Sequence, residues 1–276
     1  MSLYQNRENN THIQMDIANT YKLKEWDEYY GKERKIHIQP KKGFFASYDL
    51  HLCNVILQKF LPSPKKNIKR LTICEIGSGD GKLIKDIADK FGYKPYGIEY
   101  STVGAQMANK NGVETIVADA FDPKIKKKYK NYFDIVLSYG FIEHILPPEK
   151  AIQLHLDLVK KGGYIVIQLP RFKGYNYWKA RIFRPDLLPL HNLGIMDEER
   201  IHTLMKKFKI RELVCKNYGT LKLRLPMEKK NIRYYLLKGI CILEYVFNPL
   251  FRIIFGDKGF ETKLFSPAIL FIGQKE

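Results

Sequence analysis

The sequence has few cysteines, and their arrangement indicates neither a metal site nor a disulfide framework. The four are Cys53, Cys74, Cys215 and Cys241. They are scattered, without CxxC or metal-ligand spacing. Cys74 lies in an apolar run, which is typical of a buried free thiol. The first twenty residues are polar and lack the apolar segment of a secretory signal. A reducing, cytoplasmic location is therefore expected.

Acidic residues and long hydrophobic runs are also scarce. Lys and Arg total 47 against 29 Asp and Glu, giving a formal net charge of +18. This balance favours an anionic partner, although lysines on solvated faces explain it equally well. Residues 232–255 are very apolar, but no uncharged run approaches the roughly 18–20 residues that span a bilayer. That segment is expected to be a lid over the substrate, a dimer contact or an interfacial helix.

Short apolar runs alternate with helical patterns along most of the chain. Strands are expected at 71–76, 94–100, 113–119, 133–139 and 162–169, with helices at 82–91, 102–111 and 148–161, and with two more strands near 210–216 and 266–274. Helical patterns also occur at 26–33 and 43–61. Such alternation predicts an α/β fold with a mostly parallel sheet and helices on both faces.

The chain is predicted to form one domain with three regions. Residues 1–65 form a helical N-terminal region, and residues 66–170 form the core. Residues 171–276 hold loops on the substrate side, the last two strands and an insertion near 220–262, for which the lid is the favoured role.

A glycine-rich loop follows the first expected strand. Residues 75–81 read EIGSGDG. Glycines in such a turn let backbone N–H groups face a ligand closely. A dinucleotide fingerprint would require a third glycine where Lys82 stands, so the spacing excludes it. Glu75 places a negative charge beside this bare backbone.

This E-x-G-x-G-x-G pattern resembles motif I of the class I S-adenosylmethionine-dependent methyltransferases. The resemblance continues in register over residues 70–170: Glu99 and Asp119 end the next two strands, and FDIVLSYGFIEHI and LVKKGGYIVIQLP match the following elements. It implies a Rossmann-like seven-stranded sheet whose last strand is antiparallel. It also implies S-adenosylmethionine as the cofactor, with S-adenosylhomocysteine as its product.

The resemblance further assigns the cofactor contacts. Glu99 is expected to accept hydrogen bonds from the ribose hydroxyls and Asp119 from the adenine amino group, with Ala120 and Phe121 beside the ring. The full expected set is Glu75, Gly77, Ser78, Gly79, Gly81, Glu99, Tyr100, Asp119, Ala120, Phe121, Ser138 and Tyr139.

Two histidines are candidates for the catalytic base. The tetrad at 138–141 lacks the Asn-Pro-Pro-Tyr pattern of many adenine- or glutamine-methylating enzymes, which disfavours those substrates. Glu143-His144 follows it, an EH pair common in small-molecule members of the family. His144 is the preferred base, with structural packing as the alternative. His191 follows the fifth strand and is the second candidate. No further acid lies near the EH pair, so no metal is predicted.

The substrate side contributes a second group of candidates. Arg171, Tyr175, Tyr177 and Trp178 are expected to form a cationic and aromatic rim for a sugar ring and an anionic group, with loop packing as the alternative. We therefore expect O-methylation of a small anionic acceptor, such as a nucleotide-linked or glycan sugar of surface-polysaccharide biosynthesis.

Other functions stay open at this stage. An RNA-modifying enzyme, a lipid or natural-product methyltransferase and a cofactor-binding regulator without turnover are the alternatives. No RNA-binding module is visible, so no nucleic-acid partner is expected. The protein is expected to be a monomer or homodimer, with peripheral membrane contact as an alternative to a purely cytoplasmic location.

Overall fold

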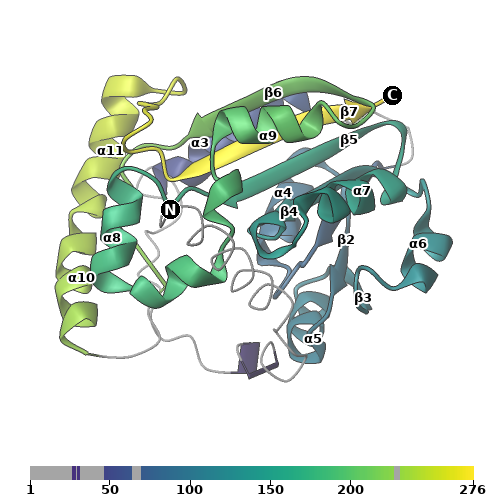
Figure 1. The fold of residues 1–276 in the computed structure, drawn as a ribbon, viewed down its shortest axis with the longest axis horizontal. Coiled ribbons are helices and arrows are strands. Elements are labelled where there is room, and N and C mark those ends of the chain that lie inside the picture. Colours follow the sequence, from purple (N-terminus) through teal and green to yellow (C-terminus); the bar gives the residue numbers. More distant parts are fainter. Residues whose placement is uncertain (1–26, 29, 32–46, 64–69, 227–230) are drawn as a thin grey trace, which may run out of the picture.

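A seven-stranded sheet forms the centre of the computed structural model, which describes residues 27–28, 30–31, 47–63, 70–226 and 231–276. The strands are β1 (Thr72–Ile76), β2 (Lys94–Glu99), β3 (Glu114–Val117), β4 (Phe133–Tyr139), β5 (Val159–Pro170), β6 (Ile210–Tyr218) and β7 (Ala268–Lys275). Their spatial order is β3-β2-β1-β4-β5-β7-β6 (Figure 1). β7 lies between β5 and β6 and is antiparallel to both, whereas the other neighbouring pairs are parallel. The predicted sheet is confirmed.

Helices cover both faces of the sheet. One face carries α3 (Tyr48–Phe60), α4 (Lys82–Phe91) and α5 (Thr102–Lys110), and the other carries α6 (Pro123–Tyr129), α7 (Pro148–Leu158) and α9 (Glu198–Met205). Alternation along β4 serves both layers: Ile135 and Leu137 pack toward the first group of helices, and Val136 packs toward the second. This burial on both faces explains why the strands read as nearly continuous apolar runs.

One boundary differs from its prediction. The helix expected at 148–161 ends at Leu158, and β5 begins at Val159. Val159 pairs with Phe133, and the register then shifts before Tyr164 pairs with Ile135. Gly163 lies within this irregularity, where a Cβ would come 2.8 Å from the Asp134 carbonyl oxygen. The close approach requires glycine, so the pair at 162–163 sits inside the strand and does not precede it.

The C-terminal part adds helices beside the sheet. α8 (Tyr175–Phe183) follows β5, and the short helices η3 (Pro185–Leu190) and η4 (Leu193–Ile195) lead to α9. α10 (Ile232–Ile242) and α11 (Glu244–Phe255) lie between β6 and β7 in the chain and run along one side of the molecule, where α10 contacts α8 and α11 contacts α3 (Figure 1).

Two observations complete the comparison with the expected elements. The structure contains no helix, among the described residues, with the length and apolarity needed to cross a membrane. The expectations for residues 1–20, for most of 26–33 and for 43–46 fall outside the described residues.

Candidate active site

The glycine loop after β1 and the end of β2 meet at one edge of the sheet. Gly77, Gly79 and Gly81 all have positive φ values, of 72°, 54° and 71°. The Gly79 N–H donates to Oε2 of Glu99 over 2.7 Å. At Gly81, a Cβ would lie 2.9 Å from the Cα of Ala108, so glycine here permits close contact between the loop and α5. The neighbouring parallel strands β1 and β2 thus bring the glycine loop and Glu99 together.

Glu99 is buried and held by backbone N–H groups. Its Oε1 accepts from the Ser101 N–H over 2.8 Å, while Oε2 accepts from Gly79. Burial raises the pKa of Glu99 above its ordinary value, although these backbone bonds oppose the rise. Each carboxylate oxygen retains acceptor capacity for a ligand hydroxyl, because it can accept more than one hydrogen bond.

Glu75 lies buried beside the glycine loop, close to two other acids. Its side chain is buried, and Oε2 finds no hydrogen-bond partner in the described part of the chain. Burial raises the pKa of Glu75 well above its ordinary value, and the nearby carboxylates of Glu99 and Asp80 add to that rise. The buried Ser78 hydroxyl is likewise without a partner among the described residues. A cationic, hydrogen-bonding ligand would satisfy this group of atoms.

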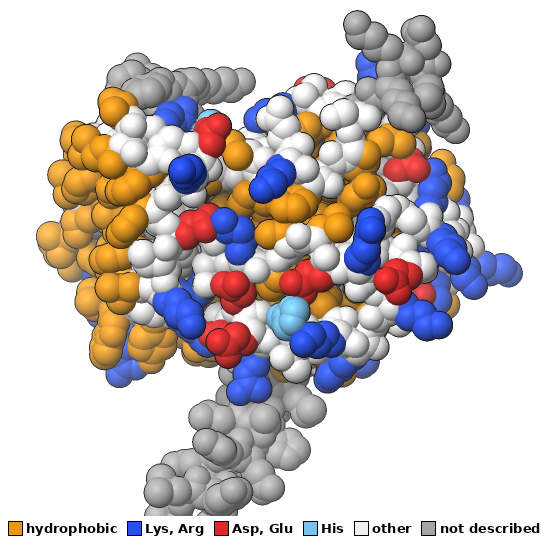
Figure 2. Space-filling view, turned by 90° about the horizontal axis from the view of Figure 1, so that it is seen from above, with side chains coloured by type: hydrophobic (Ala, Val, Ile, Leu, Met, Phe, Trp, Pro, Cys, Tyr) orange, Lys and Arg blue, Asp and Glu red, His pale blue; other side chains and the backbone are white. Residues whose placement is uncertain are grey.

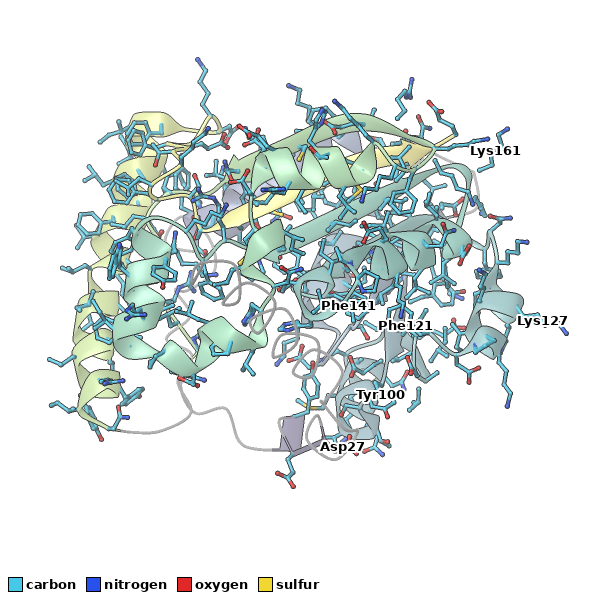
Figure 3. All side chains as sticks on the ribbon, in the orientation of Figure 1. Asp27, Tyr100, Phe121, Lys127, Phe141 and Lys161 are labelled. Carbon is cyan, nitrogen blue, oxygen red and sulfur yellow. The ribbon has the colours of Figure 1, made fainter. Side chains whose placement is uncertain are left out.

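Two residues of the N-terminal segment reach this edge and were missed in the sequence. Oδ1 of Asp27 accepts from the Ser101 hydroxyl over 2.6 Å and from the Val103 N–H over 3.2 Å. The Tyr30 hydroxyl lies 2.6 Å from the position that a Cβ on Gly79 would take. Segment 26–33 showed only a helical pattern, which carries no signal for this long-range contact. Figure 3 labels Asp27 near Tyr100.

Aromatic side chains lie beside the end of β3. Oδ1 of Asp119 accepts from the Phe121 N–H over 2.9 Å. Phe121 stacks with Phe141, with ring centroids 6.3 Å apart and planes inclined by 18° (Figure 3). Phe141 also lies against Gly77, where a Cβ would come 3.2 Å from its ring. The sequence had suggested Phe121 but not Phe141 as a ring neighbour. Ala120 is buried in the core, and Tyr100 is exposed.

Ser138 and Tyr139, the two expected cofactor contacts at the end of β4, have different surroundings. Ser138 is fully buried, and its hydroxyl has no partner among the described residues. Tyr139 belongs to the core layer beneath α3, and its hydroxyl bonds to that of Tyr218 over 2.7 Å. The Tyr139 hydroxyl is therefore engaged within the protein.

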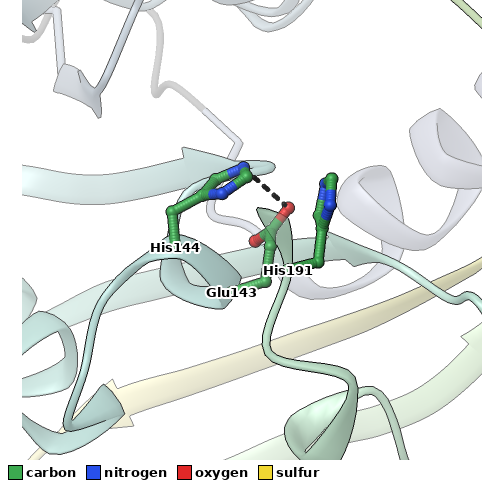
Figure 4. A group of neighbouring side chains, drawn as sticks. All are labelled: Glu143, His144 and His191. Atoms are coloured by element: carbon green, nitrogen blue, oxygen red, sulfur yellow. Dashed lines mark ion pairs between the residues drawn. The ribbon is translucent and has the colours of Figure 1, made fainter. Parts of the chain in front are cut away.

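The EH pair and His191 form one cluster (Figure 4). Glu143 and His144 lie in η2 (Ile142–His144), directly after β4, and His191 follows η3. Nε2 of His144 lies 3.9 Å from Oε1 of Glu143. The Asn192 N–H donates to the Glu143 carbonyl oxygen over 2.8 Å, which fixes the two segments to each other. The structure thus unites the two histidines that the sequence put forward separately.

Hydrogen bonds fix the proton positions on both imidazoles. Nδ1 of His144 donates to the Leu190 carbonyl oxygen over 2.9 Å, and Nδ1 of His191 donates to that of Leu187 over 2.6 Å. A carbonyl oxygen only accepts, so both neutral rings carry their proton on Nδ1 and a lone pair on Nε2. Burial lowers the pKa of His144, and burial together with His144 lowers the pKa of His191 to about 4. Both rings are neutral at pH 7.

The same cluster contains three atoms that can act as metal ligands. One atom each from Glu143, His144 and His191 lie within 4.8 Å of one another. The prediction of no metal had considered only acids beside the EH pair and had not combined them with His191. Burial raises the pKa of Glu143 to about 8, so its carboxyl group is protonated at neutral pH. A metal would have to displace that proton.

The expected substrate rim is only partly assembled. Tyr177 and Trp178 form an edge-to-face pair with centroids 5.7 Å apart, and Trp178 is exposed. Tyr175 packs against Phe265. Arg171 is instead buried: it contacts the Ser266 carbonyl oxygen and lines a small pocket with Asp197 and Glu198. Its guanidinium therefore faces the protein's own acids and not an open rim.

Several known proteins are similar to this chain. A family model described as "Methyltransferase domain" matches residues 45–214. The ubiquinone biosynthesis O-methyltransferase of Shewanella sp. (strain ANA-3) is 22% identical over 175 residues, which cover 61% of this chain and 74% of that protein. Several other curated relatives are matched over only about half of their length.

Solved structures show the same fold. Geranyl diphosphate C-methyltransferase from Streptomyces coelicolor A3(2) superposes on this chain with a TM-score of 0.56. The two chains are 12% identical, and the match covers 94% of this chain and 99% of that one. A methyltransferase from Archaeoglobus fulgidus gives 0.53, with 18% identity and coverage of 84% and 96%.

Proposed function

Because this chain belongs to the methyltransferase domain family and is an S-adenosylmethionine-dependent methyltransferase, we propose that it methylates a hydroxyl oxygen of a small-molecule acceptor, with His144 as the general base. The observation that carries this proposal is the cluster that Glu143 and His144, just after β4, form with His191, just after η3. It presents lone pairs on both Nε2 atoms beside a buried carboxyl group.

The acidic edge of the sheet fits the proposed cofactor contacts. S-adenosylmethionine, when bound, supplies an electrophilic methyl group on a positively charged sulfur. Glu75 would face the positive charge of its methionine part, and Glu99 would accept from the ribose hydroxyls. Asp119, Phe121 and Phe141 would surround the adenine. The orphaned Oε2 of Glu75 supports this placement, since a buried acceptor without a partner is costly.

The proposed chemistry is an in-line displacement assisted by a base. As the acceptor oxygen bonds to the methyl carbon, the carbon–sulfur bond breaks and the hydroxyl proton passes to Nε2 of His144. The bond from Nδ1 of His144 to Leu190 orients the ring and stabilises the imidazolium that forms. Positioning of the acceptor supplies much of the remaining rate.

For the acceptor, we propose a sugar with an anionic group, nucleotide-linked or in a glycan of surface-polysaccharide biosynthesis. The net charge of +18 and the exposed pair of Tyr177 and Trp178 support it, because aromatic faces pack well on sugar rings. Arg171 gives no support, since Asp197 and Glu198 are its nearest charges. We also propose a cytoplasmic location, which the four free cysteines support.

A second candidate acceptor is a phenolic lipid. Several curated relatives are named ubiquinone biosynthesis O-methyltransferases, at 22–24% identity. A phenol ionises more readily than a sugar hydroxyl, so a weakly basic buried histidine suits it well.

The test is a panel of acceptors incubated with S-adenosylmethionine, with release of S-adenosylhomocysteine and the mass and position of the product as readouts. We expect an O-methylated sugar or phenol, and loss of turnover in His144→Ala. Methylation confined to an amine or to RNA would contradict the proposed function.

A further inference from the structure

Helices α10 and α11 present large apolar side chains to solvent. Ile232 and Ile253 are each 72% exposed, Val246 is 61% exposed, and Leu236 and Leu250 are also exposed. Figure 2 shows hydrophobic side chains over the left edge, where Figure 1 places these helices. We call this surface the α10–α11 face. The opposite side of α10 buries Tyr234, Leu237 and Cys241, and α11 buries Glu244 and Asn248, so both helices are packed against the rest of the protein on one side. An apolar surface this continuous marks an interaction site.

The exposed charges on this face are all positive. Arg233 and Lys238 are exposed on α10. The one acid within the two helices, Glu244, is buried and accepts from the Leu223 N–H and pairs with Arg224 over 2.6 Å. Asp257, just after α11, pairs with His51 over 2.8 Å. An apolar face with cations and without an unpaired acid is complementary to an anionic, partly apolar surface.

We propose that the α10–α11 face binds the surface of a bilayer that contains anionic lipid. The apolar side chains would enter the boundary between headgroups and acyl chains, while Arg233 and Lys238 would reach the lipid phosphates. Neither helix is long and apolar enough to span the bilayer, so the helices would lie in its plane. A second copy fits less well, because pairing two such faces adds cations to each side and no acid to balance them.

Helix α8 connects the α10–α11 face to the active-site side of the sheet, whatever the acceptor is. α8 contacts α10, begins shortly after β5 and exposes Trp178 and Ile182 one turn apart. Tryptophan is enriched where a protein surface meets lipid headgroups. Bilayer binding would therefore bring the substrate side of the enzyme close to the membrane. Of the three roles expected for this segment, an exposed apolar face favours the interfacial one.

Vesicle co-sedimentation of the full chain tests the proposal. The probes are vesicles of phosphatidylcholine mixed with phosphatidylglycerol, and vesicles of phosphatidylcholine alone, at physiological ionic strength. One variant, Arg233→Glu with Lys238→Glu, reverses the cations of the face. Its matched control, Lys127→Glu with Lys161→Glu, makes the same change in charge at the opposite side of the molecule (Figure 3). A third variant, Leu236→Ser with Ile253→Ser, removes apolar contact without changing charge.

We expect binding to the mixed vesicles and little to phosphatidylcholine alone. Each cation near an anionic surface raises the partition coefficient roughly fivefold. The variant Arg233→Glu with Lys238→Glu should therefore bind the mixed vesicles at least about thirtyfold more weakly, and the control variant should be much less affected. The serine variant should lose at least about tenfold while keeping its melting temperature, since both side chains are exposed. Equal losses in the face and control variants would overturn the proposal. The proposal would also be overturned if the wild-type chain did not bind vesicles but formed a concentration-dependent dimer, and if the variant Leu236→Ser with Ile253→Ser were a monomer. That result would favour a second copy as the partner of the face.

Discussion

The imidazole rings of His144 and His191 lie with their centroids 4.6 Å apart, inclined by 50°. One ring follows β4 and the other lies beyond β5 and α8, and β4 and β5 are neighbours in the sheet. The rings of Phe172 and His191 pack edge to face, with centroids 5.0 Å apart. The pair therefore occupies a fixed position at the carboxyl ends of the central strands, where this class of fold binds its ligands.

Replacing His144 should affect the chemical step. His144→Ala is expected to lower kcat by about 10²–10⁴-fold and to leave the affinity for S-adenosylhomocysteine nearly unchanged, because a general base acts in the transition state. His191→Ala should mainly raise KM. The matched control is His202→Ala, since His202 lies at the surface and pairs with Glu212. Near wild-type kcat in both His144→Ala and His191→Ala would remove the histidines from the reaction.

Glu143 should make stability fall as pH rises. Its pKa is raised to about 8 by burial, so between its ordinary value and about 8 the folded state holds a proton that the unfolded state has lost. Unfolding then releases that proton, and higher pH favours unfolding. Glutamine does not titrate, so Glu143→Gln removes this loss of stability at high pH. The substitution should raise the melting temperature by several degrees at pH 8 and by much less at pH 5. An equal change at both pH values would show that the carboxyl group does not titrate in this range.

Gly79 should be essential for cofactor binding. An alanine there would strain the backbone at φ +54° and place its Cβ 2.6 Å from the Tyr30 hydroxyl. We expect Gly79→Ala to weaken S-adenosylhomocysteine binding by at least about tenfold, because a strained loop loses its hydrogen bond to Glu99. Gly162→Ala is the control: it has φ +73° and open space around its Cβ position. It should lower stability by about 1 kcal/mol and leave binding intact. Equal losses of binding in the two variants would show that the loss does not arise locally in the glycine loop.

Turnover should survive chelation. The ligand atoms of Glu143, His144 and His191 are close together, but a metal requires Glu143 to be deprotonated, and burial opposes this at neutral pH. Activity in EDTA should therefore equal activity without it. Loss of turnover in EDTA and recovery on adding a divalent cation would show that the cluster is a metal centre.

Local patterns were sufficient to predict the individual strands and the glycine loop, because each depends on periodicity or on residues close in sequence. The antiparallel last strand and the expected role of Glu99 came instead from the resemblance to class I methyltransferases. His144 and His191 were each expected after the end of a strand, but their direct contact was not predicted, because local patterns carry no distance between segments 47 residues apart. Asp27 and Tyr30 could not be predicted, because their contacts with Ser101 and Gly79 join segments distant in sequence. Arg171 looked free for the same reason, since Ser266 and Asp197 lie far along the chain.

Calorimetric titration with S-adenosylhomocysteine tests the account most directly, because it measures the proposed cofactor site without a known acceptor. The wild-type chain should bind it, and Glu99→Ala should weaken binding by roughly 1.5–3 kcal/mol, the range for a hydrogen bond to a charged group. Glu114→Ala is the control, since Glu114 lies on β3 at the surface and pairs with Lys94. It should bind like the wild type. Unchanged affinity in Glu99→Ala, or no binding by the wild-type chain, would contradict the placement of the cofactor beside Glu75 and Glu99.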